Sequence, residues 1–360
     1  MKHSATEIGP DRKTGTLRIA VLDARDDAAT NRWDAFVTAC PSATFFHRSG
    51  WRQVIASVFG HATYYLLAER AGAVEGVLPL AHVKSRLFGN ALVSLPFAVY
   101  GGVASASAEA ATALEAEAQA LAKRLRVDHL ELRNVSARHP EWPTQDLYCT
   151  FRKPILPDVE ANMLAIPRKQ RAMVRKGISH GLSSAVDVRP DRLFALYADN
   201  VRRHGTPALP RRYFEALQRV FDRDCEILTV SASDGRPLSS VLAFYFRNEV
   251  LPYYAGDDMA ARGLAANDFK YWELLRRACE RGCTLFDYGR SKRGTGPFAF
   301  KKNWGFEPQP LHYEYRLYKG DAIPQHNPMN PKYRAFMAIW RRLPLPVANL
   351  IGPHIVKSLG

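Results

Sequence analysis

The sequence predicts an α/β (α+β) protein that consists of two tandem units, each with a mixed, mostly antiparallel sheet flanked by helices. One reason is length: the chain has 360 residues, and a single hydrophobic core seldom extends beyond about 250–300 residues. A second reason is internal repetition, because one order of strand-like, turn-like and helix-like segments occurs once in each half. A third is composition, since 47% hydrophobic and 24% charged residues are typical of a globular protein.

The first half begins with three strand-like runs within residues 64–102, which are separated by a glycine turn and a basic loop and end in Tyr-Gly-Gly. A helix-like segment follows at 109–126, and a strand-like segment at 129–134. The half closes on an alternating aromatic stretch, LYCTFRKP, at 147–154. Alternation with a period of two predicts a strand with one buried face.

The second half repeats this order. Residues 227–256 contain three strand-like runs, and the Asp-Gly and Arg-Asn pairs between them predict tight hairpin turns. A helix-like segment at 267–281 and a strand-like segment at 285–290 follow. The half closes on HYEYRLYK at 312–319. We therefore expect one α/β unit to be used twice, with each unit closed by its own aromatic strand.

Basic residues gather on a helix-like segment between the halves, where an amphipathic helix would have a cationic face. These residues are Arg168, Lys169, Arg171, Arg175 and Lys176. Residues 191–221 then predict two helices, which the Gly-Thr-Pro sequence at 205–207 separates.

The net charge of +15 and the isoelectric point near 9.7 favour acidic partners: nucleic acid, phosphorylated precursors or an anionic membrane surface. Five cysteines, an odd number, argue against a disulfide framework and for a reducing compartment. The N-terminus has no apolar signal region, and no apolar run reaches the roughly 18 residues of a spanning helix. We expect a cytoplasmic protein, with peripheral contact at the inner face of the membrane.

The stretch FDYGRSKRGTGPFAFKKNWGFEP, residues 286–308, combines glycines, basic residues and aromatics between a strand and a helix. It is not a Walker loop, because the lysine after the second glycine is missing. Arg290, Lys292 and their basic neighbours could bind a diphosphate-linked sugar, a tRNA acceptor end or the phosphates of CoA. The alternative is a solvated basic loop. We select Lys301 as the functional lysine, and expect it at the start of the short helix, with its charge directed into a cleft.

Asp287 lies in an apolar strand, where a carboxylate must be paired or have a raised pKa. It could accept the proton of an attacking amine, or it could form a structural ion pair with Arg290 or Lys292. Glu131 and Arg133, at the matching place in the first half, favour the structural pair. Asn267 and Tyr271 open the helix that precedes this strand, where free N–H groups suit an anion. Asn267 is equally explained as the helix N-cap.

The order of helices, meander, helix, strand and short helix with an aromatic-x-x-x-Gly-Phe ending resembles the GNAT acyltransferase fold, and FKKNWGF at 300–306 matches that ending. A tandem of two such units with a basic helix before the second resembles the FemAB/FemX family. Phrases such as LVSLPFAVYGG, RHGTP and DYGRSKRGTGPFAFKKNWGF resemble, more narrowly, FemAB-type proteins that are encoded with exopolysaccharide clusters of the PEP-CTERM/exosortase type. The resemblance covers nearly the whole chain from about Leu17.

The resemblance implies an aminoacyl or acyl transferase that acts on a cell-envelope, exopolysaccharide or peptidoglycan precursor. An acceptor amine or hydroxyl would attack an activated ester directly, without a tightly bound cofactor and without a metal. The donor would be aminoacyl-tRNA or acyl-CoA; residues 260–265 lack the leading polar residue of the usual pyrophosphate motif, which weakens the case for CoA. A CoA-dependent N-acyltransferase and a non-catalytic polyanion-binding assembly factor are the alternatives.

The same resemblance assigns roles to further residues. Tyr254 lies where the central strands of this fold separate, so it could position the acceptor or protonate the leaving group, or simply pack. Tyr100 has the matching place in the first half and would bind the other substrate. Arg171 and Arg175 would recognise tRNA or a precursor phosphate.

We expect three parts in the chain: a first unit at 17–155, a second and catalytic unit at 156–320, and a tail at 321–360. The tail mixes apolar and basic residues. It could lie at a membrane surface, but its prolines oppose a long amphipathic helix, so packing across the two units is the favoured expectation.

Overall fold

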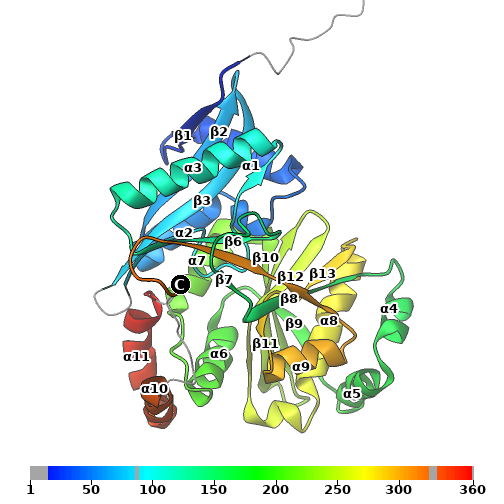
Figure 1. The fold of residues 1–360 in the computed structure, drawn as a ribbon. Coiled ribbons are helices and arrows are strands. Elements are labelled where there is room, and N and C mark those ends of the chain that lie inside the picture. Colours follow the sequence, from blue (N-terminus) through cyan, green and yellow to red (C-terminus); the bar gives the residue numbers. More distant parts are fainter. Residues whose placement is uncertain (1–14, 86–88, 324–330, 359–360) are drawn as a thin grey trace, which may run out of the picture.

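The computed structural model describes residues 15–85, 89–323 and 331–358, and these form two sheets with helices around them (Figure 1). Each sheet has eight strands in the described ranges. The first sheet has the order β1-β2-β3-β4-β6-β16-β7, with β5 beside β3. Its strands are β1 (Arg18–Val21), β2 (Ala62–Arg70), β3 (Ala73–Ser85), β4 (Gly89–Val93), β5 (Ala104–Ser105), β6 (His129–Asn134), β7 (Thr144–Gln145) and β16 (His312–Leu317).

The second sheet has the order β14-β8-β13-β12-β11-β10-β9, with β15 beside β8. Its strands are β8 (Tyr148–Pro154), β9 (Ser183–Asp187), β10 (Cys225–Ser231), β11 (Pro237–Phe246), β12 (Glu249–Asp257), β13 (Leu285–Asp287), β14 (Ser291–Lys292) and β15 (Pro308–Pro310). Neighbouring strands are antiparallel except at two matching places, where β4 and β6, and β12 and β13, are parallel. The helix between each parallel pair provides the crossover that parallel strands need.

The helices occupy corresponding places in the two halves. The first half has α1 (Asp27–Ala39), α2 (Gly50–Phe59) and α3 (Ala108–Arg124), and the second half has α6 (Asp191–Arg203), α7 (Arg211–Phe221), α8 (Ala266–Glu280) and α9 (Gly296–Asn303). Between the halves lie α4 (Val159–Ala165) and α5 (Arg168–Ser179), and α10 (Pro331–Arg342) and α11 (Leu345–Val356) come last. The predicted repeat, the hairpin turns and the break between α6 and α7 are therefore confirmed. None of the helices in the described ranges combines the length and apolar character that a membrane crossing requires.

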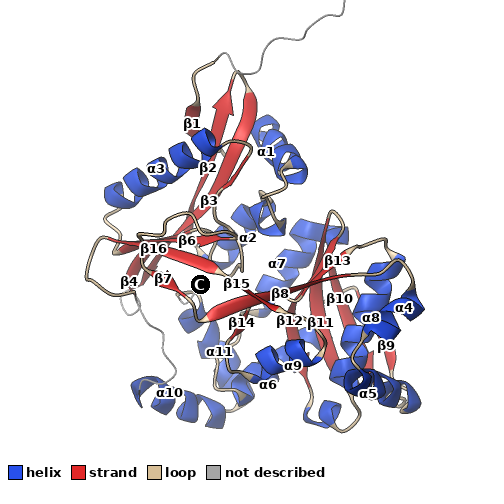
Figure 2. Cartoon of the chain, turned by 45° about the vertical axis from the view of Figure 1, so that its right-hand side comes forward, coloured by secondary structure: helices blue, strands red, loops and turns tan. Residues whose placement is uncertain are grey.

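The two halves exchange their closing strands, which the sequence did not predict. β8 follows the first half in the chain but pairs with β13 of the second sheet, where Asp287 lies opposite Arg152. β16 follows the second half but pairs with β6 of the first sheet, where Tyr313 lies opposite Arg133. Figure 2 shows β8 among the strands of the second sheet and β16 beside β6. The expectation that each unit closes on its own aromatic strand is therefore wrong.

A buried cluster of aromatic side chains joins the two halves. Phe45, in a short 3₁₀ turn of the first half, stacks on Phe244 of β11 with 4.3 Å between ring centroids. Trp51 of α2 contacts Phe221 of α7 at 5.2 Å. All four rings are buried in one cluster. Aromatic rings contribute large buried areas, so this shared core holds the two halves together. The division of the chain into units at 155/156 stays a prediction from the sequence, because the folded halves share strands and a core.

Candidate active site

The two parallel central strands of the second half separate at their carboxyl ends. Glu249 and Val250 of β12 pair with Leu285 and Phe286 of β13, and that pairing ends there, although β12 continues to Asp257. The register between β11 and β12 shifts here, because Leu242 pairs with Tyr254 and Ala243 with Pro252, which leaves Tyr253 of β12 as an extra residue. Such a bulge bends the strand that carries it. The two strands therefore diverge beyond Val250 and Phe286, and we call the region between their diverging ends the opening.

A segment of the first half lies against this opening and is held by tyrosine hydroxyls. The Tyr253 hydroxyl of β12 donates to the Phe97 carbonyl at 2.7 Å, and the Tyr313 hydroxyl of β16 donates to the Val99 carbonyl at 2.7 Å. Leu95 and Phe97 have φ angles of 56° and 64°, in the left-handed region that bulky side chains rarely adopt. The contacts across the halves compensate for this strain and fix the segment that carries Tyr100.

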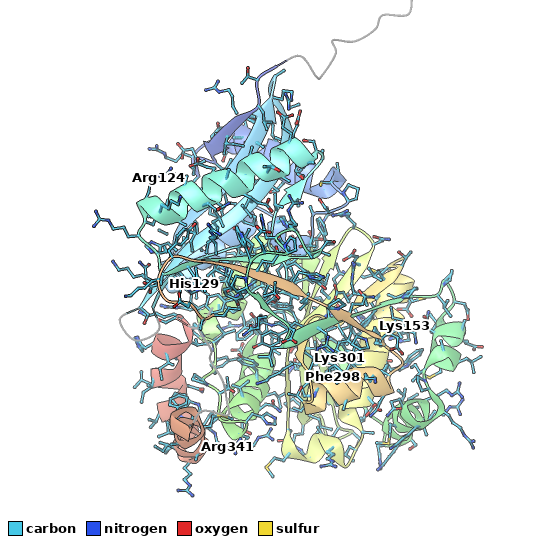
Figure 3. All side chains as sticks on the ribbon, in the orientation of Figure 1. Arg124, His129, Lys153, Phe298, Lys301 and Arg341 are labelled. Atoms are coloured by element: carbon cyan, nitrogen blue, oxygen red, sulfur yellow. The ribbon has the colours of Figure 1, made fainter. Side chains whose placement is uncertain are left out.

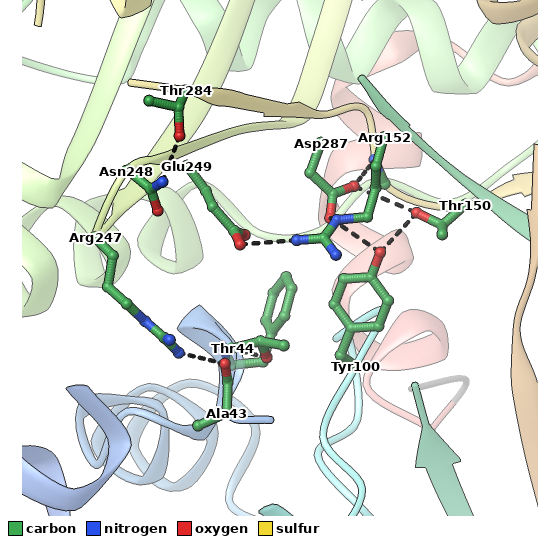
Figure 4. A network of polar contacts seen from close by, with 12 residues as sticks. Ala43, Thr44, Tyr100, Thr150, Arg152, Arg247, Asn248, Glu249, Thr284 and Asp287 are labelled. Atoms are coloured by element: carbon green, nitrogen blue, oxygen red, sulfur yellow. Dashed lines mark hydrogen bonds and ion pairs between the residues drawn. The ribbon is translucent and has the colours of Figure 1, made fainter. Parts of the chain in front are cut away.

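Asp287 is the centre of a buried network that both halves build (Figure 4). Its carboxylate accepts hydrogen bonds from the Tyr100 hydroxyl at 3.0 Å and the Gly289 N–H at 2.7 Å, and it contacts the Thr150 hydroxyl at 3.3 Å. The Arg152 Nε lies 3.2 Å from it, and Arg152 also binds Glu249 at 2.7 Å. Asp287, the candidate proton acceptor, and Tyr100, which was predicted to bind the other substrate, are therefore in direct contact.

Burial dominates the protonation of this network. Burial raises the pKa of Asp287 above its usual value, and the Arg152 guanidinium opposes part of that rise. Burial, and then the Asp287 carboxylate, raise the pKa of Tyr100 well above its usual range. The expectation of an ion pair between Asp287 and Arg290 or Lys292 is wrong, because the partner of Asp287 is Arg152 on the exchanged strand β8. The first-half pair is confirmed: Arg133 Nε donates to Glu131 at 2.7 Å.

Lys301 does not stand at the start of α9, as the sequence suggested, but in its last turn. Its ammonium donates to the carbonyls of Tyr288, Gly289 and Arg290 at 2.7, 3.0 and 3.2 Å. Lys301 is buried, and burial lowers its pKa to about 8. Its three donors hold the loop after β13 in place, so its charge acts on the backbone beside the opening.

Arg290 and Arg293 are the exposed cations of this loop, and Arg290 is the one that lies beside β13. Its guanidinium lies 4.8 Å from the ring centroid of Tyr148 and 5.9 Å from that of Tyr313, one ring from each exchanged strand. No carboxylate in the described part of the chain lies within ion-pair distance of it. One of its Nη atoms donates a long hydrogen bond of 3.4 Å to the Tyr313 hydroxyl. A guanidinium that stacks on aromatic rings and lacks a carboxylate partner suits a phosphate or carboxylate. Lys292 of β14 is half-buried nearby, opposite Tyr148 of β8.

Three other predicted residues belong to β12 and α8 of the second half. Tyr254 is half-buried on β12, and its hydroxyl pairs with that of Tyr213 on α7 at 3.0 Å. Tyr271 is half-buried against Tyr288 at 4.8 Å between centroids. Asn267 is not the N-cap of α8: the helix begins at Ala266 after Ala265, whose left-handed φ of 58° makes the turn. The roles of these residues stay predictions.

The structure does not bring the basic helix α5 to the junction of the halves. Figure 1 places α5 at the outer edge of the second half, where its Gly177 packs on Phe269 of α8. Arg171 is partly used locally, since it donates to the Leu164 carbonyl at 2.8 Å, whereas Arg175 is exposed. The predicted cationic face is confirmed by the exposed side chains Arg168, Lys169, Arg175 and Lys176.

Sequence reasoning missed Arg152, Thr150 and Glu249. Thr150 and Arg152 are two residues apart in LYCTFRKP, so they share one face of the strand, and that alternation was a usable signal. Their partner could not be found, because the exchange of β8 into the second sheet is a property of the tertiary structure. Figure 3 labels Lys301 and Phe298, which both lie on α9.

Known proteins share this architecture. Residues 168–302 match the family model described as an acetyltransferase (GNAT) domain. A stretch of 138 residues is 25% identical to the UDP-N-acetylmuramoylpentapeptide-lysine N(6)-alanyltransferase of Weissella viridescens, and it covers 37% of this chain and 40% of the alanyltransferase. The alignment thus spans less than half of that relative.

Solved structures extend the likeness to the whole fold. The crystal structure of FemX superposes with a TM-score of 0.63 at 15% identity, covering 82% of this chain and 97% of that one. A tandem GNAT protein from the clavulanic acid biosynthesis pathway gives a TM-score of 0.53 at 16% identity, covering 85% and 100%. The chain therefore has the tandem GNAT fold, of the FemX-like kind, and the predicted fold class is confirmed. The predicted transferase class agrees with the matched family.

Proposed function

We propose that the protein is a FemX-like aminoacyl or acyl transferase, with its reaction centre in the opening between β12 and β13. The observation that carries this proposal is Arg290: an exposed guanidinium that lies over two aromatic rings beside the separated strands and has no carboxylate partner among the described residues. An acceptor amine or hydroxyl would attack the ester or thioester carbonyl of the donor, the bond from that carbonyl to the donor's oxygen or sulfur would break, and the acceptor's proton would end on that leaving atom. Backbone N–H groups at the separated strands would stabilise the developing oxyanion.

The side chains have distinct proposed roles. Arg290 and Lys292 bind the anionic part of a reactant. Lys301 fixes the loop that carries Arg290 and places a positive charge near the reacting carbonyl. Tyr254, Tyr271 and Asn267 line the approach to it. Asp287 acts through Tyr100 and Arg152 as a positioning residue, because its carboxylate is buried and already holds several donors.

For the donor we propose aminoacyl-tRNA, with acyl-CoA as the second candidate. The exposed cations of α5 support tRNA, because a helical face of unpaired positive charge suits a phosphate backbone. The match of residues 168–302 to the GNAT acetyltransferase domain supports CoA. For the acceptor we propose a nucleotide-linked or lipid-linked envelope precursor, with peripheral contact at the membrane. Association with exopolysaccharide clusters of the PEP-CTERM type is the narrowest form of this proposal.

The test offers the purified protein two labelled donors, alanyl-tRNA and acetyl-CoA, with UDP-N-acetylmuramoyl-pentapeptide or a lipid-linked saccharide extract as acceptor. We expect label on an acceptor from one donor. Arg290→Gln should raise the KM for the anionic reactant about tenfold or more, since a charge-assisted bidentate contact is lost. Arg293→Gln, an exposed neighbour, is the matched control.

A second pair of variants separates the donors. The double variant Arg175→Glu with Lys176→Glu should weaken use of alanyl-tRNA and leave acetyl-CoA unaffected. Lys123→Glu with Arg124→Glu, on the exposed end of α3, is its control. Absence of transfer with both donors, together with salt-sensitive polyanion binding that Arg290→Gln leaves unchanged, would contradict the transferase and favour a binding factor.

A further inference from the structure

The last two helices, α10 and α11, are held against the rest of the protein by several contacts. Arg202 of α6 donates to the Arg341 carbonyl at the end of α10, at 2.9 Å. Ala348 and Gly352 of α11 are buried, and Gly352 lies so close to Ala208 that an added Cβ would be 3.3 Å from its backbone. At the far end, His61 of the first half hydrogen-bonds the Lys357 carbonyl at 2.8 Å. One face of each helix is therefore committed to the fold.

The opposite face of α11 is apolar and uncovered. Val347, Leu350 and Ile351 are 38%, 73% and 42% exposed, and their spacing places them on one side of the helix. On α10, Ile339 is 64% exposed. Large apolar side chains that stay exposed on a well-anchored element, at helical spacing, indicate a contact surface rather than scattered surface residues.

The charged residues of α10 and α11 themselves are all basic. Arg342, His354 and Lys357 are exposed on or beside the two helices, whereas the guanidinium of Arg341, which Figure 3 labels, lies against the fold, 3.4 Å from the His204 carbonyl. Residues 331–358 contain no aspartate or glutamate. A second copy of the same face would therefore meet like charge, whereas an anionic bilayer would meet opposite charge. Apolar side chains bordered by arginine and lysine are the composition of interfacial helices.

We propose that α10 and α11 dock on an anionic lipid bilayer, with Leu350 and Ile351 in the boundary between headgroups and acyl chains and with Arg342 and Lys357 against lipid phosphates. The apolar and the basic side chains act together, since stable peripheral attachment usually combines apolar insertion with electrostatic attraction. In Figures 1 and 2, α10 and α11 lie on the opposite side of the second half from α4 and α5. The bilayer would thus leave the cationic face of α5 open to solvent.

This inference rests on the peripheral membrane contact included in the proposed function. Its test measures binding to vesicles and does not measure acyl transfer, so the membrane proposal and the transferase proposal can fail independently. Purified full-length protein is floated with vesicles of phosphatidylcholine alone and of phosphatidylcholine mixed with phosphatidylglycerol. We expect binding to the mixed vesicles, with weaker binding at high salt because screening reduces the arginine and lysine contribution.

Two variants and a control locate the contact. Leu350→Glu with Ile351→Glu should lower the vesicle partition coefficient about tenfold or more, because two apolar anchors are lost. Arg342→Gln with Lys357→Gln should lower it about tenfold, for anionic vesicles only. Val188→Glu is the control, since Val188 is 93% exposed on a different element; its binding should equal that of the wild type. Melting curves confirm that each variant is folded.

Two results would overturn the proposal. One is wild-type binding to anionic vesicles that both double variants retain. The other is no vesicle binding at all, with sedimentation showing a wild-type dimer that Leu350→Glu with Ile351→Glu converts to a monomer; the apolar face would then cover a second copy of the chain.

Discussion

Tyr100 of the first half donates a hydrogen bond of 3.0 Å to Asp287 of the second half, inside a network that Thr150 and Arg152 of the exchanged strand complete. The carboxylate is only 1% exposed. Because a buried carboxylate must be compensated by donors or by charge, the two halves are coupled chemically at the edge of the proposed reaction centre.

Replacing Tyr100 with phenylalanine removes one donor and keeps the ring. Asp287 then remains buried with fewer partners, so we expect the free energy of unfolding to fall by about 1–3 kcal/mol, measured by urea denaturation. Tyr318→Phe is the matched control: the Tyr318 hydroxyl makes a long hydrogen bond of 3.4 Å to the Gln119 carbonyl at a half-buried site. A loss no larger than that of the control would show that the network contributes little.

Lys301 should give the protein a specific dependence on pH. Burial lowers its pKa to about 8 from the ordinary 10.5. Between these values the unfolded chain holds the proton and the folded protein releases it, so the free energy of unfolding rises with pH across that window. Relative to Lys301→Met, the wild type should gain about 3 kcal/mol there. Unfolding measured from about pH 7 to about pH 10 tests this.

The exposed neighbour Lys302 provides the control for that series. Lys302→Met should show no such difference from the wild type across the same pH range, because its side chain is exposed. A difference curve for Lys301→Met that stays level, or that falls as the pH rises, would refute a buried lysine with a lowered pKa.

Gly256 of β12 lies directly against α6. A Cβ added there would be 2.2 Å from the backbone nitrogen of Tyr197, so the backbone of β12 or of α6 would have to shift. We expect Gly256→Ala to lower the free energy of unfolding by about 3 kcal/mol or more. Gly263→Ala is the control, because its nearest neighbour would be 3.6 Å away and its φ is −62°. Equal thermal shifts for both variants would disprove the close packing.

The strand exchange predicts how fragments behave. A fragment of residues 15–155 carries β8 without its sheet, and one of residues 156–358 carries β16 without its sheet. We expect neither fragment alone to unfold cooperatively, whereas co-expression should give a one-to-one complex on size exclusion, because each strand then finds its partner. Cooperative melting of either fragment alone, with a midpoint near that of the whole chain, would count against the exchange as a requirement for folding.

The sequence by itself determined the local elements and their repetition. Periodicity identified the meanders and the helices that follow them, because these patterns depend on neighbours a few residues away. The resemblance to the GNAT fold added the short helix that ends in FKKNWGF. Periodicity also identified the exposed cationic face of α5. It misplaced Lys301 and the cap of α8, since the exact boundaries of helices depend on tertiary contacts.

Only the tertiary structure decided which strand completes which sheet, and with it the site. LYCTFRKP and HYEYRLYK have the same alternation, so either would satisfy the edge of either sheet, and strand pairing between distant segments leaves no local mark in the sequence. The exchange gives Asp287 its partner Arg152 instead of a neighbour in the chain, and it places Tyr148 and Tyr313 under Arg290. Burial, which shifts the pKa values of Asp287 and Lys301, likewise follows from packing between segments far apart in the chain.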